Sequence, residues 1–129
     1  MRAPLLITTL LVSLSSSAFA AESYAEATAR GKQDATNPAH RQWYLTEMRP
    51  AFSRFFGPTL NECAPLASQD EMHAFGLVFT VTPEGAVGRT FWKTPGRFTS
   101  CIEKNLRANT FPGSPVREFY FGLEASFGG

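Results

Sequence analysis

Two cysteines, Cys63 and Cys101, constrain the fold of this chain more than any other residues. Both follow an N-terminal export signal, and in an oxidising compartment an even number of cysteines usually means a disulfide. Cys63 to Cys101 is the only pairing available, and closing a loop of this size stabilises a domain by roughly 3 to 4 kcal/mol. Two buried free thiols are the alternative, whereas a catalytic pair would more often have C-x-x-C spacing. We therefore expect a structural disulfide.

The export signal occupies residues 1–20. A basic start and a largely apolar stretch, 5–14, are followed by serines and then by Ala18-Phe19-Ala20, an A-x-A cleavage site. A membrane anchor would need about 18 or more apolar residues, and no cysteine stands at the cleavage site to take a lipid. We expect cleavage after Ala20 and a periplasmic protein, with no transmembrane segment in the remaining chain.

The chain that remains after cleavage is formally neutral. The full sequence has 12 Lys and Arg and 11 Asp and Glu, and removal of Arg2 leaves 11 of each, because residues 1–20 contain no acidic residue. Nucleic-acid binding depends on a positive stripe that neutralises phosphates, and no such cluster occurs, so we expect no nucleic-acid partner. The length suits one domain, which we expect to be a monomer or a weak homodimer.

Two helices are predicted from the spacing of apolar residues. Residues 21–36 are small and polar without an apolar period and predict a leader that is flexible or weakly helical. Asn37-Pro38 is a helix start signal. The apolar residues after it recur in steps of three or four: Leu45, Met48, Phe52, Phe55 and Phe56. Pro50 should kink this helix, and Gly57-Pro58 should end it, with one more helical turn as an option over Thr59 to Cys63. A second helix, which carries the second cysteine, is predicted from residues with the same spacing: Phe98, Cys101, Ile102 and Leu106.

Three strands are predicted from alternating residues. In the first, 73–82, one face of the strand is phenylalanine-rich and the other is small or polar. Pro83-Glu84-Gly85 supplies a turn to the second strand, 86–93. Its core-facing residues would be Val87 and Phe91, with Arg89 on the same face. The last strand, 116–127, alternates clearly between apolar and other residues.

These elements predict an α+β domain over residues 37–129, in the order αββαβ. Its three-stranded antiparallel or mixed sheet has the strand order 2-1-3, with strand 73–82 in the centre and a right-handed crossover to the last strand. In this two-layer arrangement both helices cover the phenylalanine face. The other face is expected to be open to water or to a partner, and its residues are Ala74, Gly76, Thr80, Thr90, Trp92, Tyr120 and Glu124.

Part of this pattern resembles a known domain. The run 79–87 (FTVTPEGAV), Cys101-Ile102 on a helix, Phe111-Pro112 and the alternating final strand are similar to the C-terminal domain of TonB-type energy transducers, closest to its disulfide-bearing AgmX-like branch. The resemblance covers roughly residues 49–127. It implies that an extended peptide adds a strand to the edge of the last strand, here Arg117 to Leu123. TonB proteins keep an uncleaved membrane helix and a long spacer, so this chain is not expected to transmit force alone.

Catalytic and metal-binding motifs are missing from the sequence. His40 and His73 are the only histidines, and a zinc site needs three or four ligands. Glu71 and His73, two residues apart, are better explained as a solvated strand start. No G-x-S-x-G, P-loop or G-x-G-x-x-G motif occurs, and Gly113-Ser114-Pro115 is interpreted as a turn. We therefore expect a protein that is not an enzyme and has no cofactor, with an undetected hydrolase as the remote alternative.

The preferred hypothesis is a non-catalytic periplasmic binding or adaptor domain. It would engage a protein or peptide partner in the cell envelope through the edge of the last strand or the open sheet face. The candidate partner-binding residues are Trp92, Arg117, Phe119, Tyr120 and Phe121. In this register Trp92 and Tyr120 would both project from the open face, but we prefer partial burial of the two side chains against the leader. A second hypothesis is a periplasmic inhibitor or immunity protein that acts against an envelope-acting enzyme or toxin.

Overall fold

The computed structural model describes residues 21–127, so the predicted signal peptide lies outside the described residues. The helices and strands follow in this order: α1 (Tyr24–Thr36), α2 (Arg41–Trp43), a π-helical turn (Tyr44–Met48), α3 (Arg49–Cys63), a 3₁₀ turn (Ala64–Leu66), α4 (Gln69–His73), β1 (Phe75–Val81), β2 (Val87–Trp92), α5 (Arg97–Ala108) and β3 (Phe119–Ala125).

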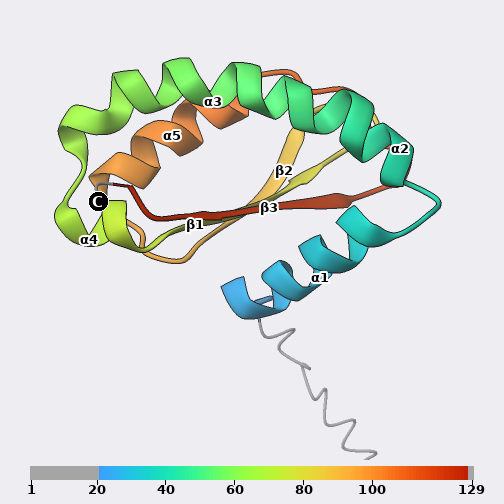
Figure 1. Ribbon diagram of the computed structural model, residues 1–129, viewed down its shortest axis with the longest axis horizontal. Helices are drawn as coiled ribbons and strands as arrows, with labels where there is room; N and C mark the ends of the chain where they lie inside the picture. Colours follow the sequence, from blue (N-terminus) through green and yellow to red (C-terminus); the bar gives the residue numbers. More distant parts are fainter. Residues whose placement is uncertain (1–20, 128–129) are drawn as a thin grey trace, which may run out of the picture.

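A three-stranded sheet lies between two helical layers (Figure 1). Helices α3 and α5 lie on one face of the sheet, and α1 lies across the other near β3. The predicted α+β class and the strand order β2-β1-β3 are confirmed. The central strand β1 pairs antiparallel with both neighbours, so that Phe79 lies opposite Thr90 of β2 and Phe121 of β3. Every residue of β1 is buried, as expected for a central strand with both faces covered.

Strand β2 contains a bulge that corrects the predicted faces. Two of its residues, Gly88 and Arg89, lie opposite the single residue Thr80 of β1, whose hydroxyl accepts the Arg89 backbone N–H at 2.8 Å. The extra residue shifts the alternation by one position. Phe91 therefore packs on the α1 side, whereas Trp92 lies on the phenylalanine face. The predicted orientations of Arg89, Phe91 and Trp92 were wrong, and the charge of Arg89 does not face the core.

The first predicted helix is longer than its sequence signals suggest. Residues 41–63 form one continuous helical run, in which the Arg49 N–H closes the π-helical turn on the carbonyl of Tyr44. Pro58 lies inside α3, so the predicted interruption at Gly57-Pro58 was wrong, whereas the optional turn over Thr59 to Cys63 is present. Proline removes one helical hydrogen bond. Because Thr59 and Cys63 beyond it are buried against the core, packing offsets that loss.

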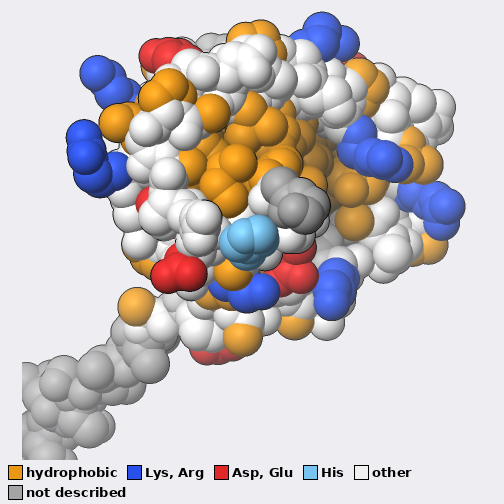
Figure 2. Space-filling model, turned by 60° about the vertical axis from the view of Figure 1, so that its left-hand side comes forward, with side chains coloured by type: hydrophobic (Ala, Val, Ile, Leu, Met, Phe, Trp, Pro, Cys, Tyr) orange, Lys and Arg blue, Asp and Glu red, His pale blue; other side chains and the backbone are white. Residues whose placement is uncertain are grey.

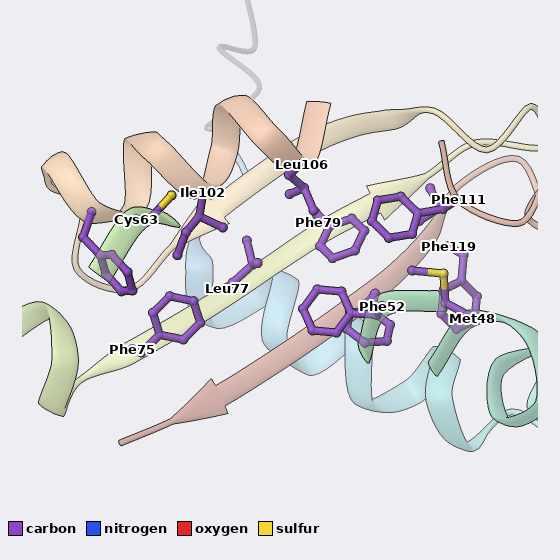
Figure 3. Packing of buried hydrophobic residues seen from close by; sticks show 13 residues of the cluster. Met48, Phe52, Cys63, Phe75, Leu77, Phe79, Ile102, Leu106, Phe111 and Phe119 are labelled. Carbon is purple, nitrogen blue, oxygen red and sulfur yellow. The ribbon is translucent and has the colours of Figure 1, made fainter. Parts of the chain in front are cut away.

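The core fills the space between the sheet and the two helices α3 and α5. Figure 3 shows side chains of β1, α3 and α5 pointing into one cluster, and its fully buried members include Met48, Phe75, Leu77, Phe79, Ile102 and Leu106. Burial of each such side chain contributes about 1.5 to 3 kcal/mol. The same cluster contains Cys63, which is bonded to Cys101 of α5 with the two Cα atoms 5.7 Å apart. The predicted disulfide pairing is thus confirmed.

The second face of the sheet is covered by α1, which corrects two predictions. Residues 24–36 form a regular helix docked on the sheet rather than a flexible or weakly helical leader, and the sheet face beneath them is not open. Ser23 and Glu26 form a reciprocal capping box at its start. Gly31 packs against the backbone of β3, since a Cβ placed there would lie 3.5 Å from the Gly122 nitrogen. The lack of a large side chain at Gly31 lets α1 approach the strand closely.

Candidate functional site

Three of the five predicted partner-binding residues are buried. Phe119 and Tyr120 have no exposed surface, and Phe121 is 5% exposed. Phe119 and Phe121 belong to the main core, while Tyr120 belongs to a smaller cluster beneath α1. Arg117 is exposed but precedes β3. Their side chains therefore do not form one contact surface, and only the backbone of β3 remains as a candidate from this set.

Trp92, the fifth predicted residue, is half-buried at the end of β2. Its ring packs edge-on against Phe75, with ring centroids 6.0 Å apart, and its indole N–H donates to Glu103 of α5 at 3.2 Å. Trp92 and Tyr120 lie on opposite faces of the sheet. The predicted burial against residues 21–36 is confirmed for Tyr120, which lies beneath α1. It was wrong for Trp92, because the bulge in β2 reverses the orientation of that side chain.

Tyr120 instead anchors α1 to the sheet through a charged network. Its hydroxyl donates to Glu22 at 2.7 Å and accepts a hydrogen bond from Arg89, which also pairs with Glu22 and with both oxygens of Glu118. The Arg30 guanidinium lies 4.4 Å above the tyrosine ring. Burial, together with the Glu22 carboxylate, raises the pKa of Tyr120 to about 12. The hydrogen bond from Arg89 lowers the pKa of Glu118.

The outer edge of β3 carries backbone groups that point away from the sheet. Lys93 donates its N–H to the carbonyl of Gly76, so Gly76 turns its polar groups toward β2. Its partner in β3, Glu124, must then turn its own N–H and C=O outward, as must Gly122 two residues earlier. Among residues 21–127 no hydrogen-bond acceptor is found for these two N–H groups. The half of the edge from Gly122 to Ala125 is thus available for pairing, more freely at Glu124 than at Gly122, whose nitrogen lies beside Gly31 of α1.

Two hollows flank this half of the edge, one on each side of the sheet. A cavity of about 230 Å³ lies on the α1 side and a more open one of about 470 Å³ lies on the α3 side, and both are lined by Tyr44, Gly122 and Leu123. The other lining residues on the α1 side include Tyr24, Thr28, Lys32 and Val78. Those on the α3 side include Arg49, Phe52, Ser53 and Phe56. A strand docked at this edge could therefore place the side chains of one of its faces in the first hollow and those of its other face in the second.

The hollow on the α3 side is mainly hydrophobic. Figure 2 views the molecule from the side on which α4 lies and shows hydrophobic side chains gathered in a depression of the surface, with Lys and Arg side chains around part of its border. A separate depression beside α4 is lined by Met72, His73 and Phe127. An exposed apolar depression of this kind is typical of a contact surface.

The charged side chains at the border of the two hollows are mostly cationic. Lys32 and Arg49 line the hollows, and among the described residues no carboxylate lies within ion-pair distance of either. The carboxylate of Glu124 accepts the hydroxyl hydrogen of Tyr24 at 2.8 Å. These lining residues were missed from the sequence, although the S-x-x-E pattern that starts at Ser23 is a helix signal that would have predicted α1.

The structure gives Glu71 a capping role. Glu71 is 6% exposed, and its carboxylate accepts hydrogen bonds from Ser68, the N-cap of α4, and from the Thr99 N–H in the first turn of α5. Glu71 and His73 belong to α4, so the predicted strand start at residue 73 was wrong and β1 begins at Phe75. Within residues 21–127 no group of three metal-ligating side chains comes together.

Comparisons with known proteins returned no relative. Neither protein-family models, nor curated proteins, nor solved structures gave a match to this chain. Over the described residues, no helix combines the length and the apolar character that a membrane crossing requires. The function must therefore be argued from the geometry itself.

Proposed function

We propose that this protein binds an extended segment of another cell-envelope protein, which adds a fourth strand to the outer edge of β3. The observation that carries the proposal is the pair of outward-pointing backbone positions, Gly122 and Glu124, between two hollows. Main-chain hydrogen bonds to such an edge supply affinity, and pockets for alternate side chains supply specificity. The same mode of binding is implied by the resemblance to TonB C-terminal domains.

The two hollows fit the geometry of an added strand. Successive side chains of a β-strand point to opposite faces of the sheet, so one set would enter the hollow on the α1 side and the other set the hollow on the α3 side. The second hollow contains Phe52 and Phe56 and favours a large apolar side chain. The first contains Lys32 and also Glu124, whose carboxylate is already bonded by the Tyr24 hydroxyl, and it favours a polar side chain, or an acidic one that reaches Lys32. The ligand we propose therefore alternates apolar and acidic residues.

The cell envelope as the proposed place of action is supported by the predicted export signal and the paired cysteines. A disulfide persists in an oxidising compartment such as the periplasm, and Cys63 is bonded to Cys101. The proposed role is that of a binding or adaptor protein, without a reaction of its own. The edge of β3 is its binding surface.

Substitution of Glu124 by proline tests the proposal, with Glu124→Ala as the matched control. Both variants lose the carboxylate that Tyr24 contacts, but only proline removes the outward N–H. The probe is a fluorescent peptide of about eight residues with alternating glutamate and valine, which is long enough to pair along a strand. We expect Glu124→Ala to bind it like the wild-type protein and Glu124→Pro to bind it about tenfold more weakly, or not at all.

Two further measurements complete this test. A peptide of alternating lysine and valine should bind more weakly than the glutamate peptide, because Lys32 and Arg49 border the hollows. Urea unfolding should give equal midpoints for the alanine and proline variants, which excludes loss of folding as the cause. Equal affinity of both variants for the glutamate peptide, or no binding to the wild-type protein, would refute pairing at this edge.

A further inference from the structure

Helix α1 occupies the part of the β3 edge that a longer partner strand would need. The Tyr120 N–H points outward and donates to the carboxylate of Asp34 in α1 at 2.9 Å. One turn earlier, Gly31 lies over the backbone around Gly122. A side chain that is 86 residues distant in the chain thus takes the first outward donor of the strand.

The position of Asp34 in its own helix is electrostatically unfavourable. It lies in the last turn of α1, which ends at Thr36, and a negative charge there opposes the helix dipole. No basic residue stands in that turn to compensate for it. The hydrogen bond from the Tyr120 N–H offsets the unfavourable interaction of the Asp34 charge with the helix dipole. Such a charge-assisted bond is stronger than one between neutral groups.

The remaining contacts of α1 are mostly polar and its buried side is small. Its fully buried residues are Ala27 and Gly31, whereas α3 and α5 bury phenylalanine, isoleucine and leucine side chains. At its other end Tyr24 bonds Glu124, and Glu22 just before the helix bonds Tyr120. A helix that buries so little apolar surface separates from the sheet at a lower free-energy cost than α3 or α5 would.

We infer that α1 is an autoinhibitory latch, in which Asp34 occupies the pairing position at Tyr120 and competes with a bound strand for the edge of β3. With the latch closed, a partner pairs only along the half from Gly122 to Ala125. When the hydrogen bond between Asp34 and the Tyr120 N–H breaks, the edge from Phe119 onward becomes available, and the partner gains further main-chain hydrogen bonds. This inference rests on the proposed function and adds to it a device that sets the affinity.

The test compares three variants of the mature protein: Asp34→Ala, Asp34→Asn and Gln33→Ala. Alanine removes the acceptor, asparagine keeps a neutral one, and the exposed Gln33 controls for the change in helix propensity. Two quantities are measured: hydrogen exchange of the Tyr120 amide, and the affinity for the alternating glutamate–valine peptide of about eight residues.

Asp34→Ala should exchange the Tyr120 amide about tenfold faster and bind the peptide about tenfold more tightly, a factor that corresponds to about 1.4 kcal/mol. Asp34→Asn should lie between this variant and the wild-type protein, and Gln33→Ala should match the wild-type protein. Unchanged amide exchange would show that Asp34 does not hold the edge. Faster exchange with unchanged or weaker binding would show that α1 does not compete with the peptide.

Adding Glu124→Pro to Asp34→Ala separates a failure of this inference from a failure of the proposed function. If the double variant loses binding but Asp34→Ala alone gains none, edge pairing stands and the latch is refuted. If the double variant binds as tightly as Asp34→Ala, the peptide does not use the β3 edge, and both proposals fall. Faster exchange of the Tyr120 amide is expected in the double variant as well. This variant also lacks the Asp34 carboxylate, and the proline at residue 124 does not change Tyr120.

Discussion

Removal of the disulfide should lower the stability of the protein by a large and calculable amount. Cys63 and Cys101 are 38 residues apart in sequence, and the chain-entropy relation for a loop of that size gives about 4 kcal/mol at 25 °C. The bridge joins the end of α3 to α5, the two helices that close the core. Its loss raises the conformational entropy of the unfolded chain, whereas the contacts of the folded state stay largely in place.

The suitable variant is Cys63→Ala combined with Cys101→Ala, because a lone cysteine would leave a reactive thiol. A loss of about 4 kcal/mol is a large part of the 5 to 15 kcal/mol that is typical of a whole domain. At a slope of about 2 kcal/mol per molar urea, the unfolding midpoint should fall by about 2 M. The melting temperature should fall by about 15 °C or more.

Urea unfolding followed by circular dichroism measures this change, with reduced wild-type protein as the control. The reduced protein should lose a similar amount of stability without any substitution. The spectrum of the variant in water should stay that of an α+β protein, since the remaining stability still favours folding. Equal midpoints for the oxidised protein and the double variant would refute the assignment of this stability to the disulfide.

Two further predictions concern a turn and two tyrosines. Gly85 has a φ of 83°, and a Cβ at this position would collide with the Phe111 carbonyl oxygen, so Gly85→Ala should cost more than about 2 kcal/mol in thermal unfolding. Gly57→Ala meets no atom within 4 Å and should be neutral or stabilising by up to about 1 kcal/mol. Equal effects would contradict the strain at the turn. Burial and a neighbouring carboxylate raise the pKa of Tyr24 and of Tyr120 to about 12 from 10.0. The stability linked to these raised pKa values is therefore complete below pH 10 and is lost as pH rises toward about 12. Ultraviolet titration of tyrosinate should show two tyrosines that ionise well above pH 10, and Tyr120→Phe should remove one of them. Ionisation of all tyrosines near pH 10 in the folded state would contradict the burial of Tyr24 and Tyr120.

The candidate site was predicted only in part. The last strand and its edge follow from the alternation of residues 116–127, but the side chains chosen there, Phe119 to Phe121, are buried. The hollow on the α1 side could not be predicted, because it depends on where residues 24–36 dock. Only the capping pattern at Ser23 marked those residues as helical, and it says nothing about the face of the sheet that they cover.

The sequence by itself determined the features that depend on local patterns. Alternating apolar and polar residues defined the strands, and apolar residues that recur every three or four positions defined the helices, because both patterns lie within short segments. The two cysteines allowed only one disulfide, because each has a single possible partner. The tertiary structure alone decided the bulge at Gly88 and Arg89, the docking of α1 on the sheet and the contact of Asp34 with Tyr120. These features arise from contacts between residues far apart in the chain, whose free energies depend on distances and burial that no short stretch of sequence contains.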